Sequence, residues 1–471
     1  MGRGWGPGLG LGVIGAALAL GGCITIGPDY VKPAAIVPAQ YKEIKGWKAA
    51  HPRDEYPKGA WWEAFRDPLL NSLELQVAIS NQTLKADEAN YRQAQALIAE
   101  ARAQLFPSLT VNGAAQRANS GGSPLTTLSL EANASWTPDI WGKIRRTIES
   151  QAAGAQASNA DLANARLSAQ SSLAIAYFEL RETDSLHDLL DDTVKQYNRS
   201  LTITQNKKNA GTAAQSDVIT AQALVLAAQA QEINTGVARG QFEHAIAVLM
   251  GRPPSGLSIA HGALMHDPPR APVRLPSTLL ERRPDIAAAE RTMQEQNALI
   301  GVAMGAYYPD LTLTGLFGAA GSPGVKALGG SNPIWSIGLS VAQTVFNGGL
   351  TDAQVAAARA TYEASVATYR QTVLTAFQQV EDQLVAIRIL GREESVQEEA
   401  VKAAEQAVQI TLNQYQAGTA DFTTVVTAEA NALSDEEALL TTREQRVVAA
   451  VSLIVALGGG WTEAQLAAEA Q

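Results

Sequence analysis

Two hydrophobic patterns divide the chain, and the first has the period of a β-strand. Within residues 126–136, polar and apolar side chains alternate without a break from Thr127 to Trp136. The apolar face carries Leu128, Leu130, Ala132, Ala134 and Trp136, and the polar face carries Thr127, Ser129, Glu131, Asn133 and Ser135. Residues 109–116, 311–319 and 335–345 alternate in the same way, apart from Leu316. A strand of about ten residues with one apolar face suits a membrane crossing, although a half-buried soluble sheet gives the same alternation.

The second pattern has the period of a helix. Apolar side chains recur every seven residues, with two more at the four-residue offset of a coiled coil. They are Val366, Val373, Val380 and Ile387, joined by Phe377 and Leu384. This stripe predicts a helix that packs along its length against another helix.

Proline supports long helices, because its ring and its missing N–H exclude it from helix interiors. Proline is absent from residues 139–252 and 334–471, whereas seven prolines crowd into 253–284. We predict a linker in the crowded segment and a helix from about Lys143 to about Gln205, which would be about 90 Å long at 1.5 Å per residue.

The patterns occur twice along the chain. "LFPSLTVNG" at 105–113 matches "YYPDLTLTG" at 307–315, and "NAGTA" at 209–213 matches "QAGTA" at 416–420. This indicates two tandem copies of about 205 residues, each reading helix, strand, loop, strand, long helix, turn, helix. In each turn the glycine is predicted to end a helix, and the threonine after it, Thr212 or Thr419, to cap the start of the next.

Four strands cannot close a barrel. Open strand edges in lipid would leave backbone N–H and C=O groups unsatisfied at several kcal/mol each. The chain must therefore oligomerise if these strands cross a membrane, and the strand count alone does not choose the number of copies.

Composition and short motifs argue against several classes of function. Lys and Arg number 36 against 46 Asp and Glu, a net charge of −10 that argues against nucleic acid as a partner. One cysteine excludes an internal disulfide and a multi-cysteine metal site, and the five histidines include no i, i+4 pair. No nucleotide or hydrolase fingerprint is present. We expect no enzyme, no metal and no cofactor.

The N-terminus has the form of a targeting signal. In residues 1–22 the only charged side chain is Arg3, followed by an apolar run that is too short to span a bilayer. "LGGC" at 20–23 resembles the lipobox of bacterial lipoproteins, in which the cysteine becomes the first residue and carries lipid. Cys23 is therefore the predicted acylation site. The residue after it, Ile24 and not Asp, implies sorting to the outer membrane of a Gram-negative bacterium.

Several motifs together resemble an outer membrane factor of the TolC family, in its NodT-type branch of efflux lipoproteins. They are the lipobox, "PDYVKP" at 28–33, "WWEAFRDPLLNSL" at 61–73, "DIWGKIRR" at 139–146, "LPSTLLERRPDIAAAE" at 275–290, "VFNGG" at 345–349 and "ALGGGW" at 456–461. The resemblance implies a mainly α fold with a membrane β-barrel. Three copies would form one twelve-stranded barrel, continued by an α-helical barrel through the periplasm.

The expected organisation follows the two repeats. It comprises a signal peptide at 1–22, a lipid-anchored segment at 23–60, a first efflux repeat at 61–252, a proline-rich linker at 253–284, and a second repeat with the C-terminal segment at 285–471. The resemblance implies an exit duct for small molecules that docks to a periplasmic adaptor and to an inner-membrane pump of the RND type. The other partners would be outer membrane lipid and two further copies of the chain.

The resemblance also implies site residues. The polar strand faces would line the pore through Thr110, Asn112, Ser129, Glu131, Asn133, Thr312, Thr314, Ser336 and Ser340. The hairpin tips would be Gly211, Thr212, Gly418 and Thr419. The periplasmic gate would lie beside them, at Asp217, Thr220, Tyr415, Gln416, Asp421 and Thr427. Many relatives carry a basic residue after the tyrosine, where this chain has Gln416, so hydrogen bonds from Tyr415 and Gln416 are the expected substitute for a salt-bridged lock.

Other interpretations stay open at this stage. Asp217 and Asp421 are either an anionic ring at the entrance or helix-start residues that satisfy backbone N–H groups. Trp136 and Trp141 fit either an interfacial aromatic belt or packing at a bend. The duct could also export protein or metal ions. In a different class, the chain could be a periplasmic coiled-coil lipoprotein that scaffolds without a pore.

Overall fold

The structure is a computed structural model that describes residues 25–35, 37–43, 60–119, 121–122, 124–269, 281–321 and 333–461. The predicted signal peptide and Cys23 lie outside these residues. The chain divides into two compact units. The first comprises Met1–Ala34, Ala89–Asn159 and Ala288–Arg370, and the second Ala35–Glu88, Ala160–Ala287 and Gln371–Gln471.

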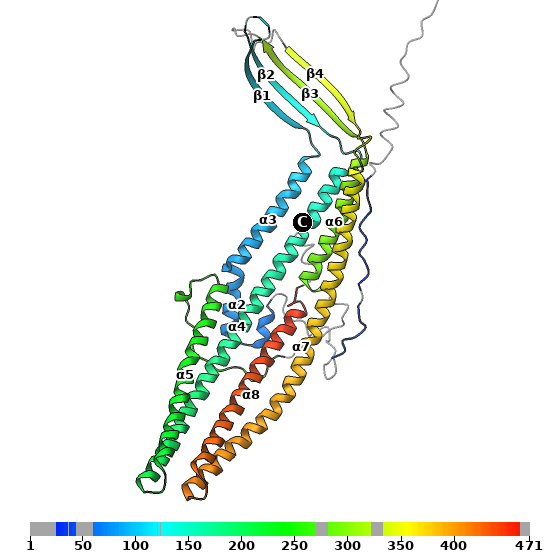
Figure 1. The fold of residues 1–471 in the computed structure, drawn as a ribbon. Helices are drawn as coiled ribbons and strands as arrows, with labels where there is room; N and C mark the ends of the chain where they lie inside the picture. The colour runs from blue at the N-terminus through cyan, green and yellow to red at the C-terminus, as the bar shows by residue number, and fades with distance from the viewer. Residues whose placement is uncertain are drawn as a thin grey trace, which may run out of the picture. The chain divides into compact units, whose positions relative to one another are not determined.

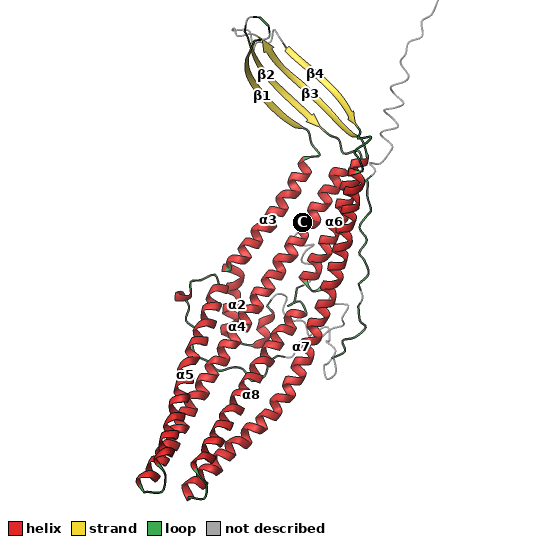
Figure 2. Cartoon of the chain, viewed as in Figure 1, coloured by secondary structure: helices red, strands yellow, loops and turns green. Residues whose placement is uncertain are grey.

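The elements follow the order expected for two copies of one pattern (Figures 1 and 2). The first copy contains η1 (Trp61–Phe65), α2 (Pro68–Ser80), α3 (Gln82–Ala103), β1 (Ser108–Ala118), β2 (Leu125–Trp136), α4 (Lys143–Asn209), α5 (Gln215–Leu249) and η2 (Pro254–Gly256). The second contains α6 (Pro284–Met304), η4 (Gly305–Tyr307), β3 (Asp310–Gly321), β4 (Pro333–Ala342), α7 (Leu350–Ala417) and α8 (Phe422–Ala456). The long helix predicted from about Lys143 is therefore confirmed and ends four residues later than expected.

The first unit contains an antiparallel sheet in the order β1-β2-β3-β4. Its register sets Leu130 opposite Gly113 and Ala319, and Gly315 opposite Ile337. Because side chains alternate between faces, this register gathers the apolar residues of all four strands on one face. That face is exposed: Leu109 is 72% and Ile337 83% accessible.

The strand ends differ slightly from the prediction. β4 was expected to reach residue 345, but it ends at Ala342, which pairs with Asp310, the first residue of β3. Before Asp310 the chain turns through η4, so residues 343–345 have no partner strand. Leu316 breaks the alternation as expected, because it pairs with Asn133 and Ser336 on the polar face.

Residues 25–29 pack closely against the helices of the first unit. The buried Arg146 of α4 donates hydrogen bonds to the carbonyl oxygen of Ile26 at 2.9 Å and to the carboxylate of Asp29 at 2.8 Å. Gly27, at φ +97°, lies so near Gly301 of α6 that a Cβ would come within 2.5 Å of the Gly301 Cα. Residues 25–29 are thus fixed to α4 and α6.

The second unit is helical. α4 and α5 form one hairpin and α7 and α8 another (Figure 1). The heptad stripe of α7 provides part of the core, since Val373, Val380 and Leu384 are at most 1% accessible. α2 begins at an N-cap, Asp67, whose carboxylate accepts from the N–H of Leu69 at 2.9 Å.

Among the described residues, the helices include none that combines the length and the apolar character needed to cross a membrane.

Candidate functional site

The two hairpins of the second unit end in the same kind of turn. Gly211 has φ +78° and Gly418 has φ +80°. In the first turn the N–H of Thr212 donates to the Lys207 carbonyl at 2.8 Å, and the N–H of Thr419 makes the matching bond to Gln414 at 2.9 Å. This is the Schellman arrangement, which needs a left-handed residue just after the helix. The glycines therefore end the helices, as predicted.

The predicted N-cap role of Thr212 and Thr419 is wrong. Each hydroxyl donates backwards to a carbonyl of the helix that has just ended, at 3.0 Å from Thr212 to Lys207 and 3.1 Å from Thr419 to Gln414. The physical reason is that the last carbonyls of a helix lack partners. The next helices start later, after the N-caps Ala214 and Asp421.

The two aspartates serve the helix starts. The Asp421 carboxylate accepts from the N–H and the hydroxyl of Thr424, both at 2.9 Å. These hydrogen bonds, the backbone one first, lower the pKa of Asp421. Asp217 accepts from the N–H of Ala214 at 3.3 Å. Both contacts are those of the helix-start interpretation, and the Asp421 side chain is exposed to solvent.

Tyr415 is buried within the chain and not displayed at its surface. Its ring is 4% accessible and packs in a cluster with Leu412, Phe422 and Val425. Lys207 of α4 donates to the Tyr415 carbonyl oxygen, and its ammonium lies 4.3 Å from the centre of the ring. The contact therefore ties α4 to α7 beside the tips. Of the other predicted gate residues, Thr220, Gln416 and Thr427 are exposed.

Sequence reasoning missed Lys207 and a second link between the hairpins. Glu429 of α8, 4% accessible, accepts a short hydrogen bond from the hydroxyl of Ser200 on α4. The sequence offered one signal, since Lys207 stands in the last turn of α4, whereas the burial of Glu429 is seen only in the structure. The partner of each residue depends on how α4 lies against the other hairpin.

The nine residues predicted to face the pore share one face of the sheet. Thr110 pairs with Asn133, Asn112 with Glu131, and Thr312 with Ser340. Ser129, Thr314 and Ser336 fall on the same face by register. One sheet thus presents a polar face and an apolar face, as the alternation predicts.

Trp136 and Trp141 lie at the helix end of the sheet and hold it there. The indole N–H of Trp136 donates to the Leu105 carbonyl at 2.9 Å, and that of Trp141 donates to the Pro309 carbonyl at 2.8 Å. Trp141 also stacks on Tyr308, with ring centres 5.0 Å apart. These contacts hold Leu105 and Pro309 in place, in the two segments that lead into β1 and β3. This is the packing role considered above.

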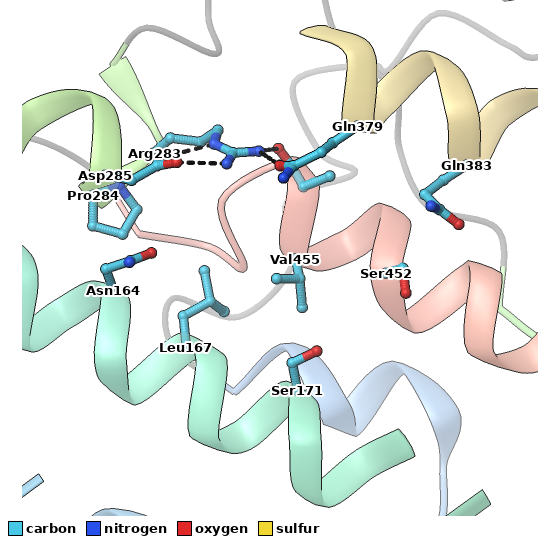
Figure 3. A pocket seen from close by; sticks show the side chains of 11 residues that line it. Asn164, Leu167, Ser171, Arg283, Pro284, Asp285, Gln379, Gln383, Ser452 and Val455 are labelled. Carbon is cyan, nitrogen blue, oxygen red and sulfur yellow. Dashed lines mark hydrogen bonds and ion pairs between the residues drawn. The ribbon is translucent and has the colours of Figure 1, made fainter. Parts of the chain in front are cut away.

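Arg283, in the motif at 275–290, organises the start of α6 (Figure 3). Its guanidinium forms a bidentate ion pair with Asp285, at 3.0 and 2.6 Å, and donates to Gln379 at 2.8 Å and to the Ala456 carbonyl at 3.1 Å. A cavity of about 260 Å³ beside it is lined by Asn164, Ser171, Gln383 and Ser452 among others. Arg283 therefore joins α6, α7 and the end of α8.

The chain is similar to known proteins over nearly all its length. The family model described as "Outer membrane efflux protein" matches residues 75–252 and 275–459. The chain is 30% identical to the pyoverdine export outer membrane protein OpmQ of Pseudomonas aeruginosa, covering 96% of this chain and 97% of OpmQ. It is 28% identical to the probable efflux pump outer membrane protein TtgC of Pseudomonas putida, with coverage of 95% and 94%. The solved outer-membrane channel OprN is 28% identical, with a TM-score of 0.86 and coverage of 93% and 99%.

Proposed function

Because this chain belongs to the outer membrane efflux protein family, we propose how it builds the exit duct of an efflux system. It is an outer membrane efflux channel and not an enzyme. In our proposal three copies join their sheets into one twelve-stranded barrel, with β1 of one copy paired to β4 of the next. The observation that carries this proposal is a four-stranded sheet with an exposed apolar face and two edges, β1 and β4, that each have a single neighbour in the described sheet. Closure would satisfy the backbone groups of both edges.

Apolar stripes on two helices support an assembly of several copies. On α5 the side chains of Ile219, Leu226 and Ile233 stand seven residues apart and are between 57% and 76% accessible. On α7, Ile389 and Val396 have the same spacing and are 45% and 68% accessible. Stripes with this period suit helix–helix packing, and neighbouring copies in a helical barrel would cover them.

The gate belongs at the hairpin tips in this proposal. The contact of Lys207 with Tyr415 ties one hairpin to the other, and a half-buried cation–π contact is worth about 0.5–2 kcal/mol. Lys207 thus supplies the positive charge that Gln416 lacks, from the other repeat. So weak a tie suits a gate that an adaptor opens by binding.

The lipid on Cys23 would sit beside the base of the sheet. Two residues of chain reach about 7 Å at most, and Thr25 lies against Gly142, just ahead of α4. Acylation would therefore anchor the protein on the periplasmic side of the outer membrane. The other partners are a periplasmic adaptor and an inner-membrane pump of the RND type, and the cargo class is small molecules.

Native mass spectrometry and bilayer conductance test the proposal together. We expect a trimer that forms pores with a small resting conductance. Lys207→Ala should raise that conductance, while Lys208→Ala, at an exposed neighbouring position, should not. A monodisperse monomer without conductance would contradict the duct and favour a non-pore scaffold. Equal conductance in both variants and wild type would place the constriction elsewhere.

A further inference from the structure

Two helices of the first unit lie next to the two edges of its sheet. α3 ends at Ala103, five residues before β1 begins, and α7 starts at Leu350, eight residues after β4 ends. Figure 1 shows α3 and α7 at opposite sides of the helices that adjoin the sheet, with α4 between them. Like the edges β1 and β4, the two helices therefore do not meet within one chain.

The first three turns of α7 carry an exposed stripe with the spacing of a coiled coil. Its members recur at intervals of four and three residues and are Asp352, Ala356, Arg359 and Glu363. With Met304 and Tyr307 they line a groove of about 370 Å³. The heptad positions of α7 that begin at Val366 continue the same spacing. The helix thus keeps a pattern for packing against another helix where the described chain leaves its face open.

α3 carries a stripe with the same spacing. Its members are all exposed, and they are Arg92, Gln95, Ala99 and Arg102. α3 runs towards the sheet and α7 runs away from it, so the two helices would be antiparallel if they lay side by side.

The two stripes are complementary when their sheet ends are level. Each residue of one stripe then faces one that suits it: Arg102 with Asp352, Ala99 with Ala356, Gln95 with Arg359, and Arg92 with Glu363. Two levels set opposite charges against each other, and an amide oxygen can accept from a guanidinium at a third. The alanine level lets the helix axes approach closely, so that the longer side chains can enter the groove.

The charges of these stripes are free for such a contact. Arg92 and Arg102 of α3 form no ion pair in the described chain. Neither do Arg359 and Glu363, although they stand one turn apart on α7. Asp352 accepts a hydrogen bond from Tyr307 at 2.5 Å, and a carboxylate can accept several.

We propose that α3 of one copy docks along α7 of the next copy in this register, with the groove of α7 as the docking surface. The contact rests on the proposed function, in which β1 of one copy pairs with β4 of the next. Because α3 leads into β1 and α7 follows β4, joining those edges brings the two helices side by side. The contact between copies then continues from the sheet into the helices.

Disulfide trapping tests the register. The purified full-length chain carries Cys23→Ser with Ala99→Cys and Ala356→Cys, because two Cβ atoms at a close approach suit a disulfide. We expect oxidation to link copies into dimers and trimers on a denaturing gel without reductant. Ala99→Cys with Gln354→Cys is the control and should leave monomers, since Gln354 is exposed on the opposite side of α7.

Charge exchange tests the complementarity. Arg92→Glu alone and Glu363→Arg alone set like charges opposite each other, and these repel. Each variant should therefore lower the temperature at which trimers dissociate in detergent, and more so at low salt. The double variant restores an opposite pair and should regain most of the wild-type temperature. Glu100→Arg makes the same change at an exposed position outside the α3 stripe and should behave like wild type.

Bilayer conductance separates this contact from the duct. Trimers that conduct, but neither link nor respond to charge exchange, would overturn the docking of α3 on α7 and leave the duct intact. Copies that link without conducting would support the docking and contradict the duct, and a monomer that does neither would contradict both. A Glu363→Arg variant that keeps its trimers but loses copurified phospholipid would assign the groove to lipid and overturn the docking.

Discussion

Glu74 shows how a single buried side chain can make the stability of the whole chain depend on pH. It lies on α2, is fully inaccessible, and neither carboxylate oxygen has a hydrogen-bond partner in the described structure. Burial alone raises its pKa to about 9. Glu74 is therefore neutral at neutral pH, because an unpaired carboxylate in an apolar site is costly.

The first prediction concerns the sign of this dependence. The folded chain keeps a proton on Glu74 that the unfolded chain releases above about pH 4.5, so stability falls as pH rises from about 4.5 towards 9. At pH 7 the free energy of unfolding has fallen by about 3 kcal/mol from its value below pH 4.5, since each pKa unit corresponds to about 1.36 kcal/mol. Thermal unfolding, followed by circular dichroism at pH 5 and 8.5, should show a smaller pH difference for Glu74→Gln than for wild type. Glu63→Gln, at an exposed position, is the control, and parallel curves for all three proteins would contradict the prediction.

A glycine in a turn and a glycine within a helix give a second prediction, because the same substitution should lower stability at one position and raise it at the other. Gly418→Ala places a side chain at φ +80°, where an L-residue costs about 1–2 kcal/mol. Gly240, within α5, has ordinary helical backbone and open space around a Cβ, so Gly240→Ala should stabilise by about 0.5–1 kcal/mol. The melting temperature should fall in the first variant and rise in the second. A rise in both would show that the left-handed turn carries no strain.

At the scale of elements, periodicity predicted the strands and long helices because each pattern repeats over many residues. The alternation at 126–136 needed no partner to be recognised, and the register then confirmed one apolar face. The predictions that were wrong concern details that depend on neighbouring groups in the folded chain. Thr212 caps the carbonyl end of α4, where the last carbonyl oxygens lack helical partners.

Contacts between helices could not be predicted from the sequence, for a related reason. Lys207 and Tyr415 stand 208 residues apart, and their meeting depends on how α4 is aligned with α7. Helix periodicity says which side of a helix is apolar, but not which residue of another helix lies opposite. The same holds for Ser200 and Glu429, and for Arg283 with Gln379.

The third prediction tests the two faces of the sheet. Leu130 lies on the apolar face and is 48% accessible, whereas the adjacent Ser129 faces the other side. In a membrane barrel, Leu130→Arg should impair insertion at a cost of about 2–4 kcal/mol near the bilayer midplane, and Ser129→Arg should be tolerated. The measurement is the fraction of each variant that resists extraction from outer membranes. Equal recovery of both variants would mean that the apolar face does not meet lipid.

At the scale of the whole molecule, the two hairpins differ in the residues just before their Ala-Gly-Thr turns. Aligned on their Ala-Gly-Thr turns, the first repeat ends its long helix in Lys207 and Lys208, where the second has Gln414 and Tyr415. The basic end of α4 therefore meets the aromatic end of α7. A lysine on α4 and a tyrosine on α7 thus make this contact between the hairpins possible.

The last prediction concerns how copies of the chain meet. Ile233 is 76% accessible on α5 and continues the stripe of Ile219 and Leu226. Burying such a side chain between copies would contribute about 1.5–3 kcal/mol, and the proposed trimer would contain this contact three times. Ile233→Asp replaces that gain with the cost of burying a charge, so native mass spectrometry should show trimers giving way to monomers. Gln231→Asp adds the same charge to α5 outside the stripe and should stay trimeric. Trimers of equal stability in both variants would mean that the α5 stripe lies outside the contact between copies.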